Sequence, residues 1–187
     1  MTQQDNTAPI VESFEQVRDS LPGAWLSDVR TGAIRSFATQ GLPTPRTEAW
    51  KYTNLNRLFR TAFDPGAEIG KPDTAKWAAL FVEGAARVVI LNGHFDEAAS
   101  DIGDLPPGVS VAPFSDAVGE TALELESELA RIAPTEGAPL VALNTAFMRD
   151  GLVLRLGECV RLERPVQVLH IVDAGGISLA VHPRTLI

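Results

Sequence analysis

The residues best suited to metal binding or nucleophilic chemistry are one cysteine and three histidines: Cys159, His94, His170 and His182. Protein metal sites usually draw on ligands spaced a few residues apart, as in Cys-x-x-Cys or His-x-x-x-His. No two of these four residues have such a spacing. The sequence therefore predicts no catalytic, cofactor-binding or metal-binding residue in this chain.

Each of these side chains also has an ordinary structural interpretation. His170 alternates with Val166 and Val168, so a strand would place it half-buried and hydrogen-bonded on their face. His182 lies in a predicted turn, which weakens its case as a ligand. Cys159 follows a Gly-Glu pair at a strand boundary, and a lone cysteine most often packs as a small apolar side chain. The alternative is that Cys159 is one ligand of a metal cluster shared with other residues.

Motifs for nucleotide hydrolysis or acyl transfer do not occur. Gly70-Lys71 is followed by Pro72 and not by the Ser or Thr of a P-loop, and no glycine precedes it at the required spacing. There is no Gly-x-Gly-x-x-Gly after a predicted strand and no Gly-x-Ser-x-Gly elbow. These observations predict that the chain is not an enzyme.

Large apolar side chains crowd into residues 44–60. They are Trp50, Tyr52, Leu55, Leu58 and Phe59. So dense a group on a short element indicates either a core anchor or a surface for a partner protein. The packing interpretation predicts that Trp50 is mostly buried and holds this segment against the first two helices.

The composition is that of a globular protein with an acidic balance. Of the 187 residues, 45% are hydrophobic and 21% are charged, and the net charge is −8. This charge gives no attraction to nucleic acid or to anionic lipid, so neither is an expected partner. With one cysteine, the chain cannot form an internal disulfide. The polar N-terminus does not indicate a signal peptide, and without a long apolar run no membrane span is expected. The simplest location is the cytoplasm.

The elements that position these residues begin with two predicted helices after a disordered tail at residues 1–9. Their apolar stripes are Ile10, Phe14, Val17 and Leu21, then Leu26, Val29, Ala33 and Phe37. Pro22-Gly23 separates the stripes, which predicts a hairpin or a bent pair, and Gly41 is placed to end the second helix. Thr44 before Pro45 predicts a further helical turn.

The middle of the chain predicts a hairpin, a short strand and two more helices. The β-branched run at 87–91 followed by Asn-Gly predicts the hairpin, and residues 109–112 predict the strand. Apolar residues recur at helical spacing over 118–132, where glutamates form a solvated face, and again over 140–147. Gly151 is placed to end the last helix.

From Gly151 onward the apolar pattern has a period of two. It predicts four short strands at 152–156, 160–162, 166–172 and 177–181. Short strands joined by tight turns are typical of a sandwich, a barrel or a β-helix. The predicted class is α+β, with a β-domain that is truncated at the end of the chain.

Gly41-Leu42-Pro43-Thr44, followed by Glu48-Ala49-Trp50-Lys51-Tyr52-Thr53, closely resembles a signature of the SufB/SufD family of iron–sulfur cluster assembly proteins. Later features occur in a similar order: the 88–96 hairpin, the helix at 143–147, the Arg164-Pro165-Val166 strand entry and His182-Pro183-Arg184. The resemblance covers most of residues 25–187. The SufD branch fits better than SufB, whose cysteine-bearing segments have no counterpart here.

The resemblance implies a scaffold with a helical N-terminal part, a central parallel β-helix and C-terminal helices. On this basis residues 10–150 are the helical N-terminal region with short strands, and residues 151–187 are the first strands of a truncated β-helix. The implied partners are SufB and the ATPase subunit SufC, in the cytoplasm. Their contacts and the iron–sulfur cluster itself are expected outside this N-terminal fragment, so the fragment itself is expected to hold no cofactor.

Two other interpretations stay open at this point. One is a small ligand-binding β-domain with a helical extension, similar to a cupin but without the His-x-His pair of cupin metal sites. The other is a generic protein-interaction module. Self-association through an unpaired final strand at 177–181 is expected if the β-domain is truncated.

Overall fold

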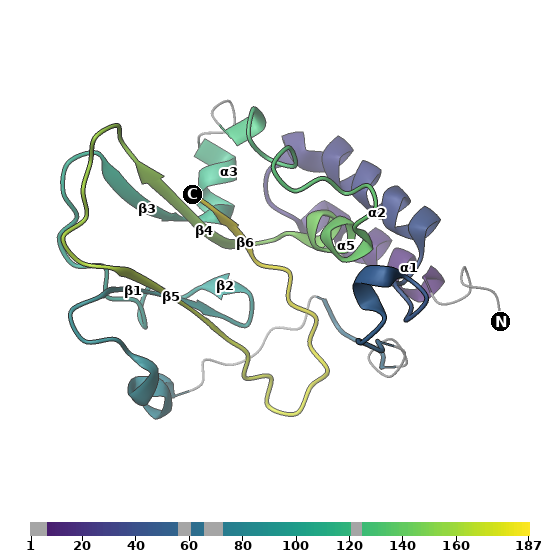
Figure 1. Ribbon diagram of the computed structural model, residues 1–187, viewed down its shortest axis with the longest axis horizontal. Helices are drawn as coiled ribbons and strands as arrows, with labels where there is room; N and C mark the ends of the chain where they lie inside the picture. The colour runs from purple at the N-terminus through teal and green to yellow at the C-terminus, as the bar shows by residue number, and fades with distance from the viewer. Residues whose placement is uncertain (1–6, 56–60, 66–72, 121–124) are drawn as a thin grey trace.

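The computed structural model describes residues 7–55, 61–65, 73–120 and 125–187. It has the predicted α+β class. Helices α1, α2 and α5 form one layer, and two small sheets lie beside them (Figure 1). No helix in these described ranges is long and apolar enough to cross a membrane.

Helices α1 (Ala8–Val17) and α2 (Ser27–Gln40) form the predicted helical pair. Two single-turn 3₁₀ helices and Gly23 join them, and Gly23 has a positive φ of 73°. Gly41 follows α2 with a φ of 70°, so it ends the helix as predicted. The other predicted turn begins later than expected, at Glu48 and not at Pro45.

The helical layer has its own apolar core. Phe14 of α1 and Phe37 of α2 are almost fully buried, and both belong to a cluster with Phe147 of α5 (Pro139–Phe147). The Phe14 and Phe147 rings meet edge to face with centroids 5.6 Å apart. The apolar residues at 10–21, 33–37 and 142–147 therefore pack on one another, as their spacing predicts. The start of the second stripe differs, because Leu26 and Val29 pack against α3 and β4 instead.

The first sheet has the order β2-β1-β5. Strand β1 (Ala86–Leu91) turns through Asn-Gly into β2 (His94–Phe95), which confirms the predicted hairpin. On its other edge β1 pairs in parallel with β5 (Val166–Ile171).

The second sheet has the order β3-β4-β6. Strand β3 (Val109–Pro113) pairs antiparallel with β4 (Gly151–Leu156), and β4 pairs in parallel with β6 (Arg184–Leu186). The sheets face each other across a core that includes Val88 and Leu152, both fully buried. This core takes the inward side chains of both sheets.

The three strands after the last helix trace one turn of a coil. The chain leaves the second sheet at β4, crosses to the first sheet at β5, and returns beside β4 at β6. Gly151 opens β4 and does not end α5 as predicted, because α5 stops at Phe147. Gly151 has a φ of 143°, and a Cβ there would collide with the backbone oxygen of Arg184 in the returning strand.

Two of the four predicted C-terminal strands are wrong. Residues 160–162 form no strand, and residues 177–181 contribute only one bridge, between Leu179 and Asp64. The returning strand is instead β6, in the residues that the sequence placed in a turn. Residues 184–186 form a strand because they pair in parallel with β4. A pattern of alternating apolar residues does not reveal such a long-range contact.

The long helix predicted over 118–132 is also wrong at its C-terminal end. Helix α3 covers Phe114–Glu120, and the predicted positions 121–124 lie outside the described residues. Ala130 has a φ of 64°, which a helix does not contain, and Ile132 is 75% exposed. Leu125 and Leu129 still pack into the core beneath the second sheet.

Candidate functional site

The turn of coil ends in two open strand edges. Strand β5 pairs with β1 on one edge, and β6 pairs with β4 on one edge. Within the described ranges, no strand of either sheet pairs with the opposite edge of β5 or of β6. Unpaired strand edges carry backbone donors and acceptors that can bind a further strand.

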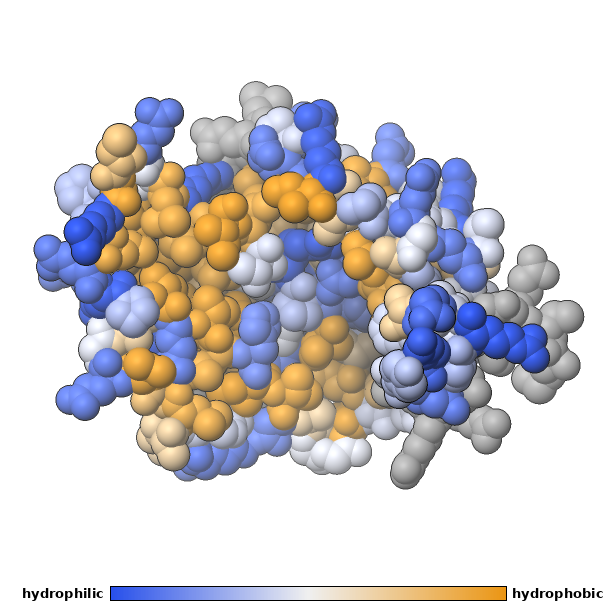
Figure 2. All heavy atoms as spheres, viewed as in Figure 1, coloured by the Kyte–Doolittle hydropathy of each residue, from blue (hydrophilic) through white to orange (hydrophobic). Residues whose placement is uncertain are grey.

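Apolar side chains line a groove near one of these edges, that of β6. Figure 2 shows apolar residues gathered over the sheet half of the molecule. A groove of about 680 Å³ runs beside β3, β4 and β6. Its lining includes Leu156 and Ile187, which are 48% and 76% exposed, and Ile132. The open β6 edge next to an apolar groove forms a surface suited to extending the second sheet.

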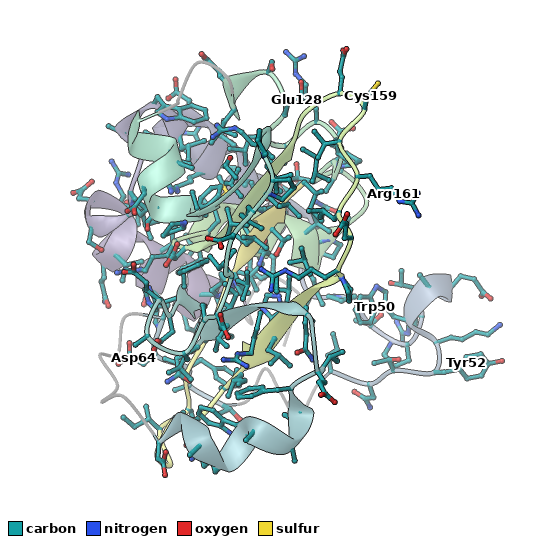
Figure 3. The ribbon with its side chains drawn as sticks, turned by 90° about the vertical axis from the view of Figure 1, so that its left-hand side faces the viewer. Trp50, Tyr52, Asp64, Glu128, Cys159 and Arg161 are labelled. Carbon is teal, nitrogen blue, oxygen red and sulfur yellow. The ribbon has the colours of Figure 1, made fainter. Side chains whose placement is uncertain are left out.

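The aromatic segment around Trp50 projects from the body of the protein, as Figure 3 shows. Tyr52 is 91% exposed, with the Lys51 ammonium 5.1 Å from its ring centroid, and Lys51 also pairs with Glu48 at 2.6 Å. Trp50 is half-buried and does not pack into the helical core, so the prediction that it holds the segment against the first helices is wrong. Leu42 supplies that anchor.

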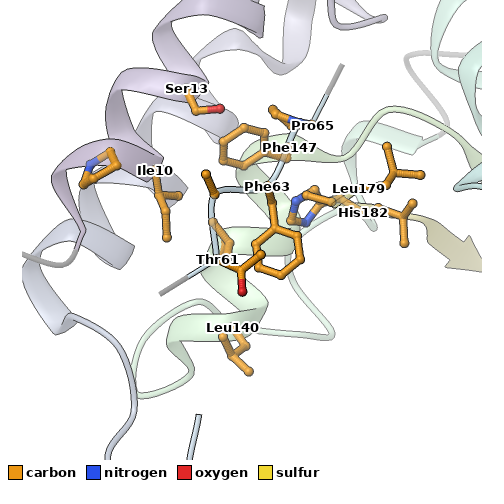
Figure 4. A pocket seen from close by; sticks show the side chains of 14 residues that line it. Ile10, Ser13, Thr61, Phe63, Pro65, Leu140, Phe147, Leu179 and His182 are labelled. Carbon is orange, nitrogen blue, oxygen red and sulfur yellow. The ribbon is translucent and has the colours of Figure 1, made fainter. Parts of the chain in front are cut away.

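His182 lines a pocket of about 450 Å³ between α1, α5, residues 61–65 and residues 179–182 (Figure 4). Its ring stacks on Phe147 with centroids 4.9 Å apart and planes 22° apart. Burial lowers the pKa of His182 to about 4, so the imidazole is neutral at neutral pH. The pocket wall is mainly apolar and includes Ile10, Phe63 and Leu179.

The other candidate side chains lie apart from one another. His170 is exposed, so the predicted half-buried position is wrong, and Cys159 is exposed in a turn with a φ of 60° (Figure 3). The His94 Nδ1 atom lies 3.8 Å from the Asp150 carboxylate. In the part of the chain that is described, no three His, Cys, Asp or Glu side chains form a group that could hold a metal ion.

Asp150 is a buried junction that the sequence analysis missed. It is 6% exposed, and its carboxylate accepts hydrogen bonds from the backbone N–H groups of Phe95 at 2.8 Å and Ser115 at 3.1 Å. Its backbone oxygen accepts from the N–H of Arg184. Asp150 thus links β2, α3 and the start of β6. The sequence signal for this role was the position of an acidic residue directly between the predicted helix and the strand that follows it.

Arg30 is a second buried polar residue that the sequence analysis missed. It is 3% exposed and donates hydrogen bonds to the backbone oxygens of Pro22, Gly23 and Met148. Arg30 thereby ties the helical pair to the segment that leads into β4. The available signal was its spacing, because Leu26, Arg30, Ala33 and Phe37 follow one helical face.

Comparison with known proteins gives the family. Residues 9–168 match the family described as the SufBD protein N-terminal region. The chain belongs to this family. The SufBD match extends from α1 through β4 and into the first residues of β5, so it includes the helical layer but not β6.

The chain is also similar to an iron–sulfur cluster assembly SufBD family protein of Synechocystis. The two are 26% identical over 165 residues, which cover 87% of this chain and 36% of the relative. This chain thus spans little more than a third of the length of that curated SufBD relative. The family resemblance drawn from the sequence signature is confirmed.

Proposed function

We propose that this chain is a non-catalytic, SufD-like scaffold element of a cytoplasmic SUF complex that assembles iron–sulfur clusters. Membership of the SufBD family supports the link to cluster assembly. The observation that carries the scaffold role is the turn of coil from β4 through β5 to β6, with both outer edges open among the described residues. A scaffold of stacked coils needs such edges, because each turn pairs with the next.

The proposal includes the partners SufB and SufC. We place their contacts, and the cluster that the complex handles, outside residues 1–187, so that this chain holds no cofactor of its own. The relative is much longer than its matched region, which leaves it room for further coils and helices. The role proposed for the present chain is to begin the coil and to support its first turn with the helical layer.

A ligand-binding module is the second candidate function. The pocket beside His182 has about 450 Å³ and an apolar wall, which is within the usual range for small-molecule sites. Its described lining residues include no Asp, Glu, Lys or Arg. This candidate would be favoured over the scaffold if a small molecule bound saturably in the pocket and the chain did not join a SUF complex.

A chimera tests the SufD-like role. This chain replaces the matching N-terminal region of a functional SufD, and the chimera is expressed with SufB and SufC subunits. The expected result is a purified complex with the chimera in the SufD position and restored cluster assembly. A control chimera carries the chain in place of the SufB N-terminal region and should recover less complex. A folded SufD chimera that fails to assemble, or preferential recovery in the SufB position, would contradict the proposal.

A further inference from the structure

The imidazole ring of His182 is largely enclosed by the protein, but its nitrogens have no hydrogen-bond partner in the part of the chain that the structure describes. The ring face has a packing role, because it stacks on Phe147 of the helical core. A neutral imidazole offers one N–H donor and one nitrogen acceptor, and buried polar groups are normally hydrogen-bonded. His182 therefore has unused capacity for two hydrogen bonds.

Both ring nitrogens of His182 reach open space. The Nε atoms of Arg30 and Arg184 are sealed from solvent without a partner, whereas neither nitrogen of His182 is sealed in this way. The space beside the ring is the pocket of about 450 Å³ that His182 lines together with α1, α5 and residues 61–65. Figure 4 shows the His182 ring directed into the group of side chains that line this pocket. A molecule in the pocket can thus reach the unused nitrogens.

The wall of this pocket favours a ligand without charge. Its described lining combines two phenylalanine rings with aliphatic side chains and contains no Asp, Glu, Lys or Arg. Burial lowers the pKa of His182 to about 4, so the imidazole adds no charge at neutral pH. An ion would lose its hydration in the pocket without gaining an opposite charge. The ligand that fits this wall is therefore neutral and mainly apolar.

One hydroxyl group is the simplest match to the His182 ring. A hydroxyl can donate to the bare ring nitrogen or accept from the N–H, whichever nitrogen carries the proton. The side chains of Ser13 and Thr61 are further hydrogen-bonding groups in the wall. A flat aromatic body suits the rest of the wall, because aromatic pairs gain more than their buried area alone supplies.

We propose that this pocket binds a small neutral aromatic molecule with one hydroxyl group, which forms a hydrogen bond with His182. A pocket of this size has room for a molecule of two fused rings. The inference names a ligand class for the second candidate function and rests on the same pocket. It does not depend on the scaffold role, which the chimera tests separately.

The test uses the whole chain at pH 7.5 and three probes of one shape: 2-naphthol, naphthalene and 2-naphthoate. Equilibrium dialysis gives the affinities, and the histidine ring signals in NMR spectra report the contact. The expected result is saturable binding of 2-naphthol that shifts the His182 signals. Naphthalene should bind about five- to tenfold more weakly, because it lacks one hydrogen bond. The charged 2-naphthoate should bind more weakly than 2-naphthol as well.

The decisive variant is His182→Phe, which keeps a ring on Phe147 and removes both nitrogens. It should bind 2-naphthol no better than naphthalene. The matched control is His170→Phe, at an exposed position on β5, which should keep the preference for 2-naphthol. Without saturable binding of 2-naphthol, or with equal binding of 2-naphthol and naphthalene by the unaltered chain, the proposal fails. These two outcomes need no variant, so they decide even if His182→Phe does not fold. A preference for 2-naphthol that a folded His182→Phe retains would also overturn it.

Discussion

Gly151 and Arg184 lie opposite each other at the start of the parallel pair β4–β6, and the backbone of Arg184 occupies the space that a Gly151 side chain would need. This contact closes the turn of coil. The N–H of Arg184 also donates to the backbone oxygen of Asp150, at 2.9 Å. The start of β6 therefore lies directly beside the residues that connect α5 to β4.

Gly151→Ala should destabilise the protein by about 1–3 kcal/mol or more, because the left-handed φ and the clash with β6 act together. Urea unfolding monitored by circular dichroism gives the free energy. Gly32→Ala is the control, since a Cβ there meets nothing within 4 Å in the middle of α2. Gly32→Ala should add about 0.5–1 kcal/mol of stability. Equal stability of Gly151→Ala and the unaltered chain would show that β6 does not return at this position.

His182 should make stability depend on pH. Its native pKa of about 4 lies below the unfolded value of about 6.5, so the unfolded chain takes up a proton first as the pH falls. The contribution of His182 is complete above about pH 6.5 and is lost progressively down to about pH 4, by up to about 3 kcal/mol. Unfolding free energies from pH 4 to 7 measure this loss.

The comparison for that experiment is His182→Phe, which keeps a ring on Phe147 and should show a flatter pH profile. The exposed His170→Gln is the control and should keep the slope of the unaltered chain. If His182→Phe and the unaltered chain lose stability in parallel between pH 6.5 and 4, the imidazole is not buried against Phe147 in solution.

Tyr52→Ala should change the free energy of unfolding by no more than about 0.5 kcal/mol, because the ring is 91% exposed. Phe37→Ala, in the helical core, should cost about 3–5 kcal/mol. Denaturant titration compares the two. If Tyr52→Ala weakens binding to SufB while stability stays the same, the projecting segment is a partner surface, and the proposed placement of the SufB contact outside this chain is wrong. A core-sized loss of stability would mean that the segment packs down onto the protein.

Anaerobic addition of iron and sulfide should give no stoichiometric cluster on this chain, because its one cysteine stands alone among possible ligands in the described ranges. Visible absorption and iron content after desalting measure the outcome. Cys159→Ser is the matched variant and should behave identically. A stable chromophore that disappears in Cys159→Ser would show that this exposed thiol is a cluster ligand.

Local sequence signals predicted much of the fold correctly. The Asn-Gly turn after β1 and Gly41 after α2 fix their neighbours through short-range backbone geometry, so sequence alone was sufficient. Strand β6 was missed because its residues have little β-branched character and their pairing with β4 is remote in sequence. Residues 177–181 have the stronger strand pattern, yet they make only one bridge.

The candidate sites were less predictable than the fold. Trp50 was expected in the core because it is large and aromatic, but the projecting turn holds it away from the helices. Arg30 was passed over because a charged residue on an apolar helical face is usually assigned to solvent. Only the three-dimensional arrangement places the oxygens of Pro22, Gly23 and Met148 around it.

The claim that the coil ends in edges open to another strand is tested most directly by light scattering coupled to size exclusion, over a range of protein concentrations. The chain should show a mass that rises with concentration, since the β5 and β6 edges can pair between molecules. Thr185→Lys, which places a charge on β6, should weaken this association, whereas Thr39→Lys, at an exposed position on α2, should not. A strictly monomeric chain at every concentration, with no difference between the two lysine variants, would contradict an open coil.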